Sequence, residues 1–334
     1  MGMTVLQLAD RLRSEADAYL FLEELRWGSG DPVCPHCDNV GASYIAPTNG
    51  VSRKTRTGTM SERRVWRCLS CRKQFSALTG TIFHGTKASL RTWVLVIFEM
   101  CASKNGIAAR EVERKYGVCA RTAWHMMHRI RESMKNDVLV ASMRGTIVAD
   151  ETFIGGDPKN RHESRRERDG ERTLVPVQPG RDVGNVKTDK TSVLSLIDKR
   201  TGEVRSRIVP DVSGASLRKA MAEQIDFAGS HLHTDGWKAY KGIGQGFLSH
   251  QWVDHSDGEY VRGDVSTNMV EGYFSQLKRS LDGTHHRVSR EHLGRYLVEF
   301  DFRYSSRKLS DTQRMHRLMG QVGGRRLTYK RVTS

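Results

Sequence analysis

The sequence predicts a multidomain protein in which a small metal-held β module and an all-α module precede a larger α/β domain. Three observations lead to this prediction. Two Cys-x-x-Cys pairs lie near the N-terminus, apolar residues then recur at helical spacing from Leu90, and after Met143 the apolar period changes mostly to two. A chain of 334 residues with 37% apolar content is long enough for two or three domains and can build a hydrophobic core.

The chain is strongly basic. It contains 54 Lys and Arg against 38 Asp and Glu, which gives a formal charge of +16. This excess indicates a polyanionic partner such as nucleic acid, although a diffuse basic surface would give the same total. The longest clean apolar run, Trp93 to Phe98, is far shorter than the ~20 residues of a membrane helix, and Met1 to Leu8 does not resemble a secretory signal. We therefore expect a cytoplasmic protein.

The N-terminal residues, 1–30, are predicted to form a helical lead-in. Leucines and Tyr19 recur at helical spacing between Thr4 and Trp27. We expect a break in this helix near Ala16 to Ala18.

Residues 31–78 are predicted to form a zinc ribbon. The cysteines of its two knuckles are Cys34, Cys37, Cys68 and Cys71. Two knuckles supply the four thiolates of a closed tetrahedral site, which is structural because no position is left for substrate. A redox Cys-x-x-Cys normally occurs once, and His36 remains an alternative ligand. Cys101 and Cys119 lie in helical patterns and are expected to be small buried residues.

Residues 86–136 are predicted to form a helix-turn-helix. Leu90 to Ala102 has the pattern of an apolar helix, a second helix ends near Tyr116, and a Gly-containing turn leads into a basic helix from Ala120 to Met134. The expected DNA-reading residues of that last helix are Arg121, Thr122, His125 and Arg129. An ordinary helical hairpin with a solvated basic face is the alternative.

Residues 143–308 are predicted to form the α/β domain. Strands are expected at 146–154, 191–197, 203–210, 231–235 and 247–253, and helices at 213–224, 237–242, 267–280 and 290–304. The order β-β-β-α-β-α-β-α describes a ribonuclease H-like fold, with three antiparallel strands, two parallel ones and helices on both faces.

Three carboxylates can converge in this layout. Asp150 lies in the first strand, Asp235 ends the fourth, and Glu271 lies in the first turns of the following long helix. Oxygen ligands of this kind suit two Mg²⁺ or Mn²⁺ ions, which can activate a water or a 3′-hydroxyl and stabilise the leaving oxygen. Lys278, two helical turns after Glu271, is placed to contact a DNA phosphate, and the adjacent Arg279 is a further candidate.

Other acids compete for these roles. Glu151 neighbours Asp150 but should point to the opposite face of the strand. A polar stretch between elements, expected to be a solvated loop, carries Asp254, Asp257, Glu259 and Asp264. Asn268, one turn before Glu271, either orients a ligand or caps the helix.

The chain resembles a known family, the ISXO-like bacterial insertion-sequence transposases, in which a zinc ribbon precedes a DDE catalytic domain. The stretches that carry the resemblance are Phe21–Trp27 with Cys34–Cys37, Trp66–Cys68, Phe75, Thr79–Phe83, Tyr116–Val118, Thr122–Trp124, His128–Arg131, Asp150–Gly156, His233–Tyr240, Asn268–Glu271, Phe274–Ser275, Leu277–Lys278 and Phe300–Tyr304. The resemblance covers about residues 15 to 308. It implies that Asp150, Asp235 and Glu271 are the catalytic triad and that Lys278 accompanies them. Some family members carry Asn at the third position, so Glu271 favours an active metal site.

The hypothesis that follows is a DNA transposase. The zinc ribbon and helix-turn-helix would bind terminal inverted repeats in double-stranded DNA, and the metal site would free a 3′-hydroxyl that attacks target DNA. Synapsis of two ends implies a homodimer or a higher oligomer, and the partner implies a bacterial, nucleoid-associated location. Two alternatives remain: a zinc-dependent DNA-binding regulator whose last domain is only a scaffold, and a ribonuclease H-like nuclease without strand transfer.

The sequence also supports predictions for two further segments, residues 159–190 and 309–334. Residues 159–190, which mix charges with Pro176, Pro179 and Gly180, are expected to be a mobile insertion, either a DNA clamp or a solvated loop. Residues 309–334 are expected to be a basic tail. From Glu271 to Ser334 the chain has 14 Lys and Arg against 6 Asp and Glu, which suggests that the C-terminal helices grip DNA.

Overall fold

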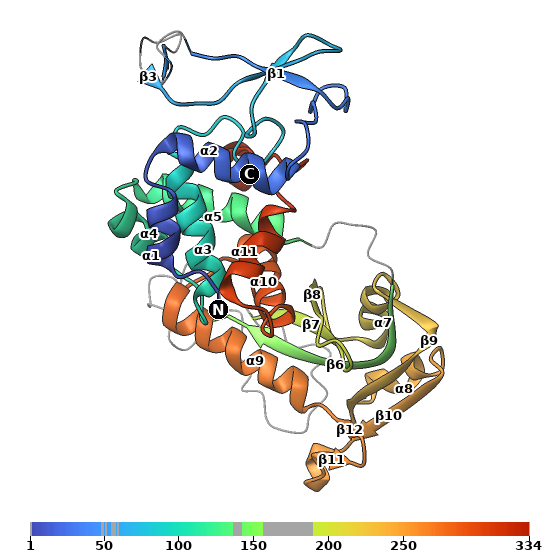
Figure 1. The fold of residues 1–334 in the computed structure, drawn as a ribbon. Coiled ribbons are helices and arrows are strands. Elements are labelled where there is room, and N and C mark those ends of the chain that lie inside the picture. Colours follow the sequence, from blue (N-terminus) through green and yellow to red (C-terminus); the bar gives the residue numbers. More distant parts are fainter. Residues whose placement is uncertain are drawn as a thin grey trace. The chain divides into compact units, whose positions relative to one another are not determined.

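The computed structural model describes residues 2–47, 50, 52–54, 58, 60–135, 142–155 and 190–333. The chain divides into two compact units (Figure 1): unit 1 contains residues 1–135 and 306–334, and unit 2 contains residues 136–305. The insertion expected at 159–190 lies outside the described residues except for Lys190. Within the described part of the chain, none of the helices combines the length and the apolarity needed to cross a membrane.

Unit 1 begins with α1 (Val5–Arg11) and α2 (Glu15–Trp27). The break between them lies at residues 12–14, so the break predicted near Ala16 to Ala18 was wrong. Ser14 and Asp17 form a capping box, in which the Asp17 carboxylate accepts from the Ser14 backbone N–H at 2.8 Å. This reciprocal pair starts α2 ahead of the alanines, which favour the helix interior.

The ribbon region of unit 1 is built from very short strands. β1 (Ala42–Tyr44), β4 (Trp66–Cys68) and β5 (Gln74–Phe75) form an antiparallel sheet in the order β1-β4-β5, and β2 (Arg53–Lys54) pairs with β3 (Met60–Ser61). Its side-chain core is small and depends on α2. Glu23 of α2 accepts hydrogen bonds from Trp66 Nε1 at 2.8 Å and Arg64 Nε at 2.7 Å, and these bonds join the ribbon to the helix.

The helical part of unit 1 contains α3 (Leu90–Ala102), α4 (Ala109–Tyr116) and α5 (Ala120–Met134). Gly117 ends α4 in the left-handed conformation, with φ of 63°, which a residue with a Cβ rarely adopts. The turn therefore has the local geometry that the sequence predicts between two packed helices.

The C-terminal stretch folds into unit 1. It forms α11 (Asp311–Met319), which packs against α2, α3 and α5, and α12 (Tyr329–Thr333), which packs against α5. Val322 accepts a backbone hydrogen bond from Ile82 at 3.1 Å, and the side chain of Leu318 is fully buried. Residues 309–334, expected to be a basic tail, thus contribute helices and core side chains to this unit.

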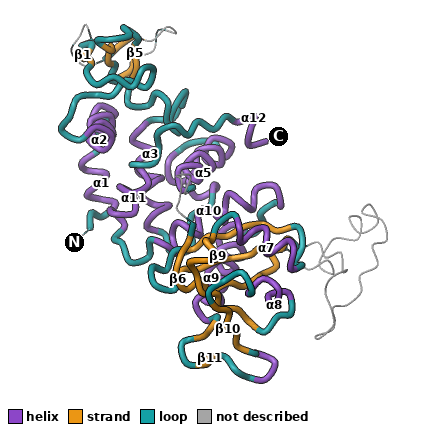
Figure 2. Tube along the Cα trace, turned by 90° about the vertical axis from the view of Figure 1, so that its right-hand side faces the viewer, coloured by secondary structure: helices purple, strands orange, loops and turns teal. Residues whose placement is uncertain are grey.

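Unit 2 is built on a five-stranded mixed sheet with the order β10-β9-β6-β7-β8 (Figures 1 and 2). The strands are β6 (Met143–Ile154), β7 (Thr191–Asp198), β8 (Val204–Val209), β9 (Ile225–Asp235) and β10 (Ser249–Val253). β6, β7 and β8 are antiparallel, whereas β9 runs parallel to β6 and β10 parallel to β9. The strands follow the predicted order, and β9 starts six residues earlier than the expected strand at 231–235.

Helices cover both faces of this sheet. α7 (Gly214–Ala222) and α8 (Ala239–Gly244) pack on one face, where Ile147 and Ala149 belong to the core. α9 (Asn268–Ser280) and α10 (Arg290–Ser305) pack on the other face, where Val148 belongs to the core. Because side chains alternate along a strand, Asp150 lies on the α9 face and Glu151 on the α8 face.

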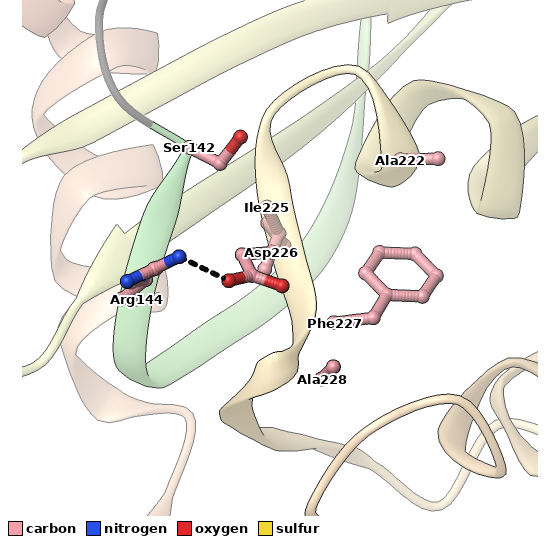
Figure 3. A pocket seen from close by; sticks show the side chains of 7 residues that line it. All are labelled: Ser142, Arg144, Ala222, Ile225, Asp226, Phe227 and Ala228. Carbon is pink, nitrogen blue, oxygen red and sulfur yellow. Dashed lines mark ion pairs between the residues drawn. The ribbon is translucent and has the colours of Figure 1, made fainter.

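The end of the sheet away from Asp150 and Asp235 holds an open cavity of about 740 Å³ (Figure 3). It lies at the N-terminal ends of β6 and β9, where Arg144 forms an ion pair with Asp226 at 2.8 Å. The remaining lining residues are Ser142, Ala222, Ile225, Phe227 and Ala228. The carboxylates predicted to act lie toward the C-terminal ends of the same strands, so this cavity is a separate feature.

Candidate functional site

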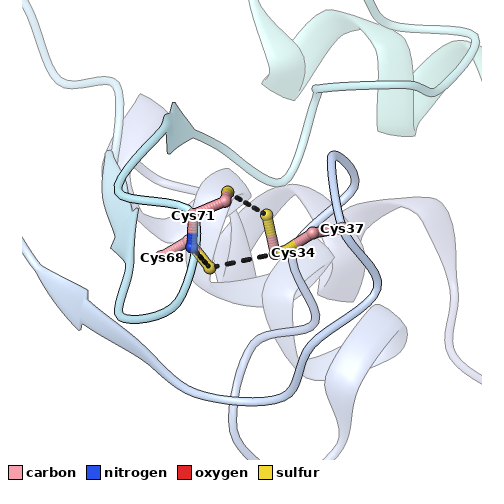
Figure 4. Close-up of side chains that lie close together, drawn as sticks. All are labelled: Cys34, Cys37, Cys68 and Cys71. Atoms are coloured by element: carbon pink, nitrogen blue, oxygen red, sulfur yellow. Dashed lines mark hydrogen bonds between the residues drawn. The ribbon is translucent and has the colours of Figure 1, made fainter.

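The four knuckle cysteines converge on one point in unit 1 (Figure 4). The Cys34 and Cys71 sulfurs lie 3.7 Å apart, and the Cys37 and Cys68 sulfurs 3.6 Å apart. All four sulfurs lie within 4.8 Å of one another. β4 ends at Cys68, and antiparallel pairing of β4 with β1 and β5 holds the second knuckle in place.

This arrangement fits a structural zinc ion. A tetrahedral site with Zn–S bonds of about 2.3 Å has sulfurs about 3.8 Å apart, close to both measured separations. The Cys71 backbone N–H donates to the Cys68 sulfur at 3.4 Å and lowers the pKa of Cys68, which favours the thiolate that binds metal. His36, which is exposed, lies outside the cluster. Cys101 and Cys119 also lie outside it: Cys101 is buried as expected, whereas Cys119 is exposed, contrary to the prediction.

Asp150 and Asp235 lie on neighbouring strands of unit 2. The parallel register pairs Val148 with His233, and Asp150 and Asp235 follow two residues later on each strand. Two steps along a strand return to the same face, so both carboxylates lie on the α9 side of the sheet.

Glu271 and Lys278 lie on α9, which packs against β6 and β7. The apolar side of α9 is buried, with Val270 fully inaccessible to solvent and Leu277 1% exposed. Glu271 remains partly exposed, and Lys278 and Arg279 beyond it are exposed. Seven residues are nearly two helical turns, so Glu271 and Lys278 share one side of the helix.

Electrostatics connect these four residues. Burial and, after it, the charges of Asp235 and Glu271 raise the pKa of Asp150 to about 7, and Lys278 opposes the rise. Burial also raises the pKa of Asp235. Among the described residues, the four cysteines are the only group of three or more potential ligands close enough together to hold a metal ion, and the three carboxylates do not form such a group in this structure. The site therefore brings together negative charges whose mutual repulsion a bound cation would reduce.

Comparison with known proteins decides the family. An ISXO2-like transposase domain matches residues 142–305, and a transposase zinc-ribbon domain matches residues 13–74. The chain belongs to the ISXO2-like transposases. It is also 27% identical, over 291 residues, to an uncharacterised protein of the transposable element ISH50 from Halobacterium salinarum, an alignment that covers 87% of this chain and 90% of the relative.

The other candidate residues of the transposase, the remaining acids and Asn268, each have an identifiable position or hydrogen-bond partner. Glu151 is directed away from the Asp150 face, as expected: the hydroxyl of fully buried Tyr240 donates to it, and burial raises the pKa of Glu151 to about 8. Asp254 accepts from the backbone and hydroxyl of Ser256. Asn268 is the exposed first residue of α9 and does not occupy the N-cap position, which belongs to Thr267.

Glu259 and Asp264 lie in a segment that is more ordered than the solvated loop expected there. The transposase forms a hairpin from β11 (Val261–Arg262) and β12 (Val265–Ser266), preceded by a 3₁₀ turn at His255–Asp257. Glu259 pairs with Arg262, and Asp264 with Lys199. Strands of two residues are too short to show a hydrophobic period, so the sequence pattern does not predict this hairpin.

Helix α5 of the transposase presents only some of the predicted DNA-reading residues. Arg121 and Thr122 are exposed at its N-terminal end. His125 is half-buried against the Tyr329 ring of α12, with ring centroids 5.4 Å apart. The N-terminal residues of a recognition helix are those that reach base edges, so Arg121 and Thr122 keep the geometry expected of such a role.

Arg129 does not fit the DNA-reading role that the sequence predicted. Its side chain is 6% exposed, donates to the His84 carbonyl at 2.7 Å, and lies over the Trp93 ring at 5.1 Å. Burial and, to a smaller extent, the charge of Arg326 lower the pKa of Arg129 to about 10. In this conformation Arg129 is a structural residue of unit 1 and is not available to DNA.

Proposed function

We propose that this transposase binds the terminal inverted repeats of an insertion sequence and uses two divalent ions, Mg²⁺ or Mn²⁺, for 3′-end hydrolysis and strand transfer. One observation carries the proposal: Asp150 and Asp235 lie side by side toward the ends of parallel strands, on the sheet face where α9 places Glu271 and Lys278. The strand order of unit 2 supports a ribonuclease H-like catalytic domain, which the match to a DDE-type transposase domain also favours.

The three carboxylates and Lys278 have different proposed roles. Asp150, Asp235 and Glu271 supply hard oxygen ligands, and their mutual repulsion favours cation binding. Bound divalent ions would supply charge stabilisation for the attacking and leaving oxygens of an in-line displacement. Lys278 would neutralise a phosphate of the strand being cut. Its flexible stem and exposed position suit that contact.

The reaction would proceed in two displacements. Water attacks the phosphorus at the transposon end, the bond to the 3′ oxygen breaks, and a 3′-hydroxyl and a 5′-phosphate result. The freed 3′-hydroxyl then attacks a target phosphodiester, so one P–O bond forms as another breaks. Bond energy is conserved in this second step, and the mechanism needs neither ATP nor a covalent enzyme intermediate. Joining two ends requires at least two copies of the chain.

DNA recognition is proposed to use the ribbon and the N-terminal end of α5. Replacing Arg121 with Ala should raise the Kd for end-containing DNA by roughly fivefold to 150-fold, the ~1–3 kcal/mol of a specific arginine contact. The slope of log K against log salt should fall by about 0.9 if Arg121 neutralises a phosphate. Fluorescence anisotropy at several salt concentrations measures both.

The matched control for Arg121→Ala is Lys219→Ala. Lys219 is exposed on α7, on the sheet face opposite Asp150, and should leave both affinity and slope unchanged. Equal affinity and slope for Arg121→Ala and the wild-type protein would remove α5 from the proposed DNA surface.

The proposed activity is tested with DNA that carries the inverted repeats flanking the gene. With Mg²⁺ we expect nicks at the 3′ ends of the element and, when target DNA is added, joined products on a denaturing gel. Specific binding without cleavage would support a regulator instead. Cleavage without joined products would support a nuclease. Either result would contradict the proposal.

A further inference from the structure

The connection between β10 and α9 brings two residues to Glu271 that sequence patterns did not single out. His255 begins the 3₁₀ turn after β10, and Thr267 immediately precedes α9, on the far side of the β11–β12 hairpin. Eleven residues separate them in sequence, but their side chains meet: His255 Nε2 lies 3.2 Å from Thr267 Oγ1. The hairpin closes this connection and returns the chain beside its starting point.

The Thr267 side chain forms a hydrogen bond with Glu271. Its hydroxyl donates to Glu271 Oε1 at 2.8 Å, and the residue is fully buried. Thr267 occupies the N-cap position of α9, where a threonine side chain ordinarily accepts from the helix backbone, yet its side chain makes no such capping bond. The hydroxyl is directed to a carboxylate of the proposed metal site at the expense of helix capping.

His255 completes the chain of hydrogen bonds. A threonine hydroxyl has one proton, and here that proton goes to Glu271 Oε1, so the hydroxyl must accept from His255. His255 therefore carries hydrogen on Nε2 and donates to Thr267 Oγ1. The same nitrogen lies 3.7 Å from Glu271 Oε1, which adds a direct electrostatic contact.

The surroundings hold His255 in this orientation. Its ring packs against the Tyr260 ring with centroids 5.1 Å apart and an interplanar angle of 31°. His255 also acts electrostatically on Asp235, where it opposes the rise in pKa that burial causes. The Asp235 carboxylate is itself fixed by the Trp237 backbone N–H at 3.1 Å. The histidine thus interacts with two of the three predicted metal ligands.

We propose that His255 and Thr267 are positioning residues that hold the Glu271 carboxylate for divalent-cation binding. This inference rests on the proposed function, because it assigns Glu271 to the metal site. Hydrogen-bond partners of a metal ligand fix its orientation, and losing one typically costs about 10–100-fold in metal affinity. The hydrogen-bond chain engages Oε1 of Glu271, and the side chain remains 42% exposed for a cation to approach.

The test measures Mn²⁺ binding to the full-length, zinc-loaded protein without DNA, by electron paramagnetic resonance. Thr267→Val, which keeps the shape but removes the hydroxyl, and His255→Ala should each weaken Mn²⁺ binding about tenfold or more. Thr267→Ser restores the hydroxyl, and His255→Gln places an N–H donor near the lost Nε2, so both should bind within about threefold of wild type. The double variant should lose much less Mn²⁺ affinity than the product of the two single losses, because His255 acts mainly through Thr267 and only secondarily by its direct contact with Glu271.

Two reference variants make the outcome decisive. Ser256→Ala lies in the same turn as His255, but its hydroxyl donates to Asp254, so it should bind Mn²⁺ as the wild type does. Asp235→Asn should abolish tight binding. If Asp235→Asn binds normally, the proposed metal site itself is wrong. If Asp235→Asn loses Mn²⁺ while Thr267→Val and His255→Ala bind as the wild type does, only the positioning role is overturned.

Discussion

Replacing Asp235 with asparagine should reduce Mg²⁺-dependent cleavage of end-containing DNA by about a thousandfold, equivalent to about 4 kcal/mol of lost transition-state stabilisation. The amide has nearly the shape of the carboxylate, so β9 should fold normally, but it lacks the negative charge that a divalent ion requires. Asp235 ends β9 beside Asp150, and only its side chain changes. Single-turnover cleavage of labelled DNA measures the loss.

The matched control is Asp226→Asn at the other end of the same strand. Asp226 forms an ion pair with Arg144, whose side chain is 75% exposed, and such surface pairs contribute at most about 1 kcal/mol to stability. This variant makes the same chemical change far from Asp150 and should cleave at the wild-type rate. Full cleavage and strand transfer by Asp235→Asn would show that the metal mechanism proposed here is incorrect.

Replacing Cys68 with serine should unfold the zinc ribbon and abolish its contribution to DNA binding. Structural zinc supplies on the order of 10 kcal/mol to the folding of such modules, and the β4–β5 sheet has too few buried residues to compensate. Cys68 is a fully buried member of the cluster, and its sulfur lies 3.6 Å from that of Cys37. Mass spectrometry should report loss of zinc, and amide hydrogen exchange should report loss of protection at residues 31–78.

Cys119→Ser provides the control for this experiment. Cys119 is an exposed cysteine at the N-cap of α5, outside the cluster, and serine is a good N-cap residue. It should keep one zinc per chain and full protection of the ribbon. A Cys68→Ser protein that retained both would mean that the four cysteines do not form a zinc site.

Short-range signals determined most of the fold. Cysteine spacing predicted the cluster because a Cys-x-x-Cys knuckle positions its two sulfurs locally. The change from helical to strand period predicted the strand order of unit 2, since burial of one face imposes that period wherever the strand lies. The alternation of side chains along a strand also correctly predicted that Glu151 points to the face opposite Asp150. The break between α1 and α2 was misplaced because the capping box at Ser14 outweighs the alanines after it.

Residue patterns were enough to predict the modules, the cysteine cluster and the joint action of Asp150, Asp235 and Glu271. The basic residues of α5 that are available could be identified only in the folded chain, because Arg129 is buried by contacts with His84 and Trp93, far from it in sequence. Tertiary folding also made the C-terminal stretch part of unit 1 and brought His255 and Thr267 to Glu271. A local pattern encodes what neighbouring residues do to the backbone. Burial and hydrogen bonding between distant side chains arise only when the chain closes on itself, and no local period records them.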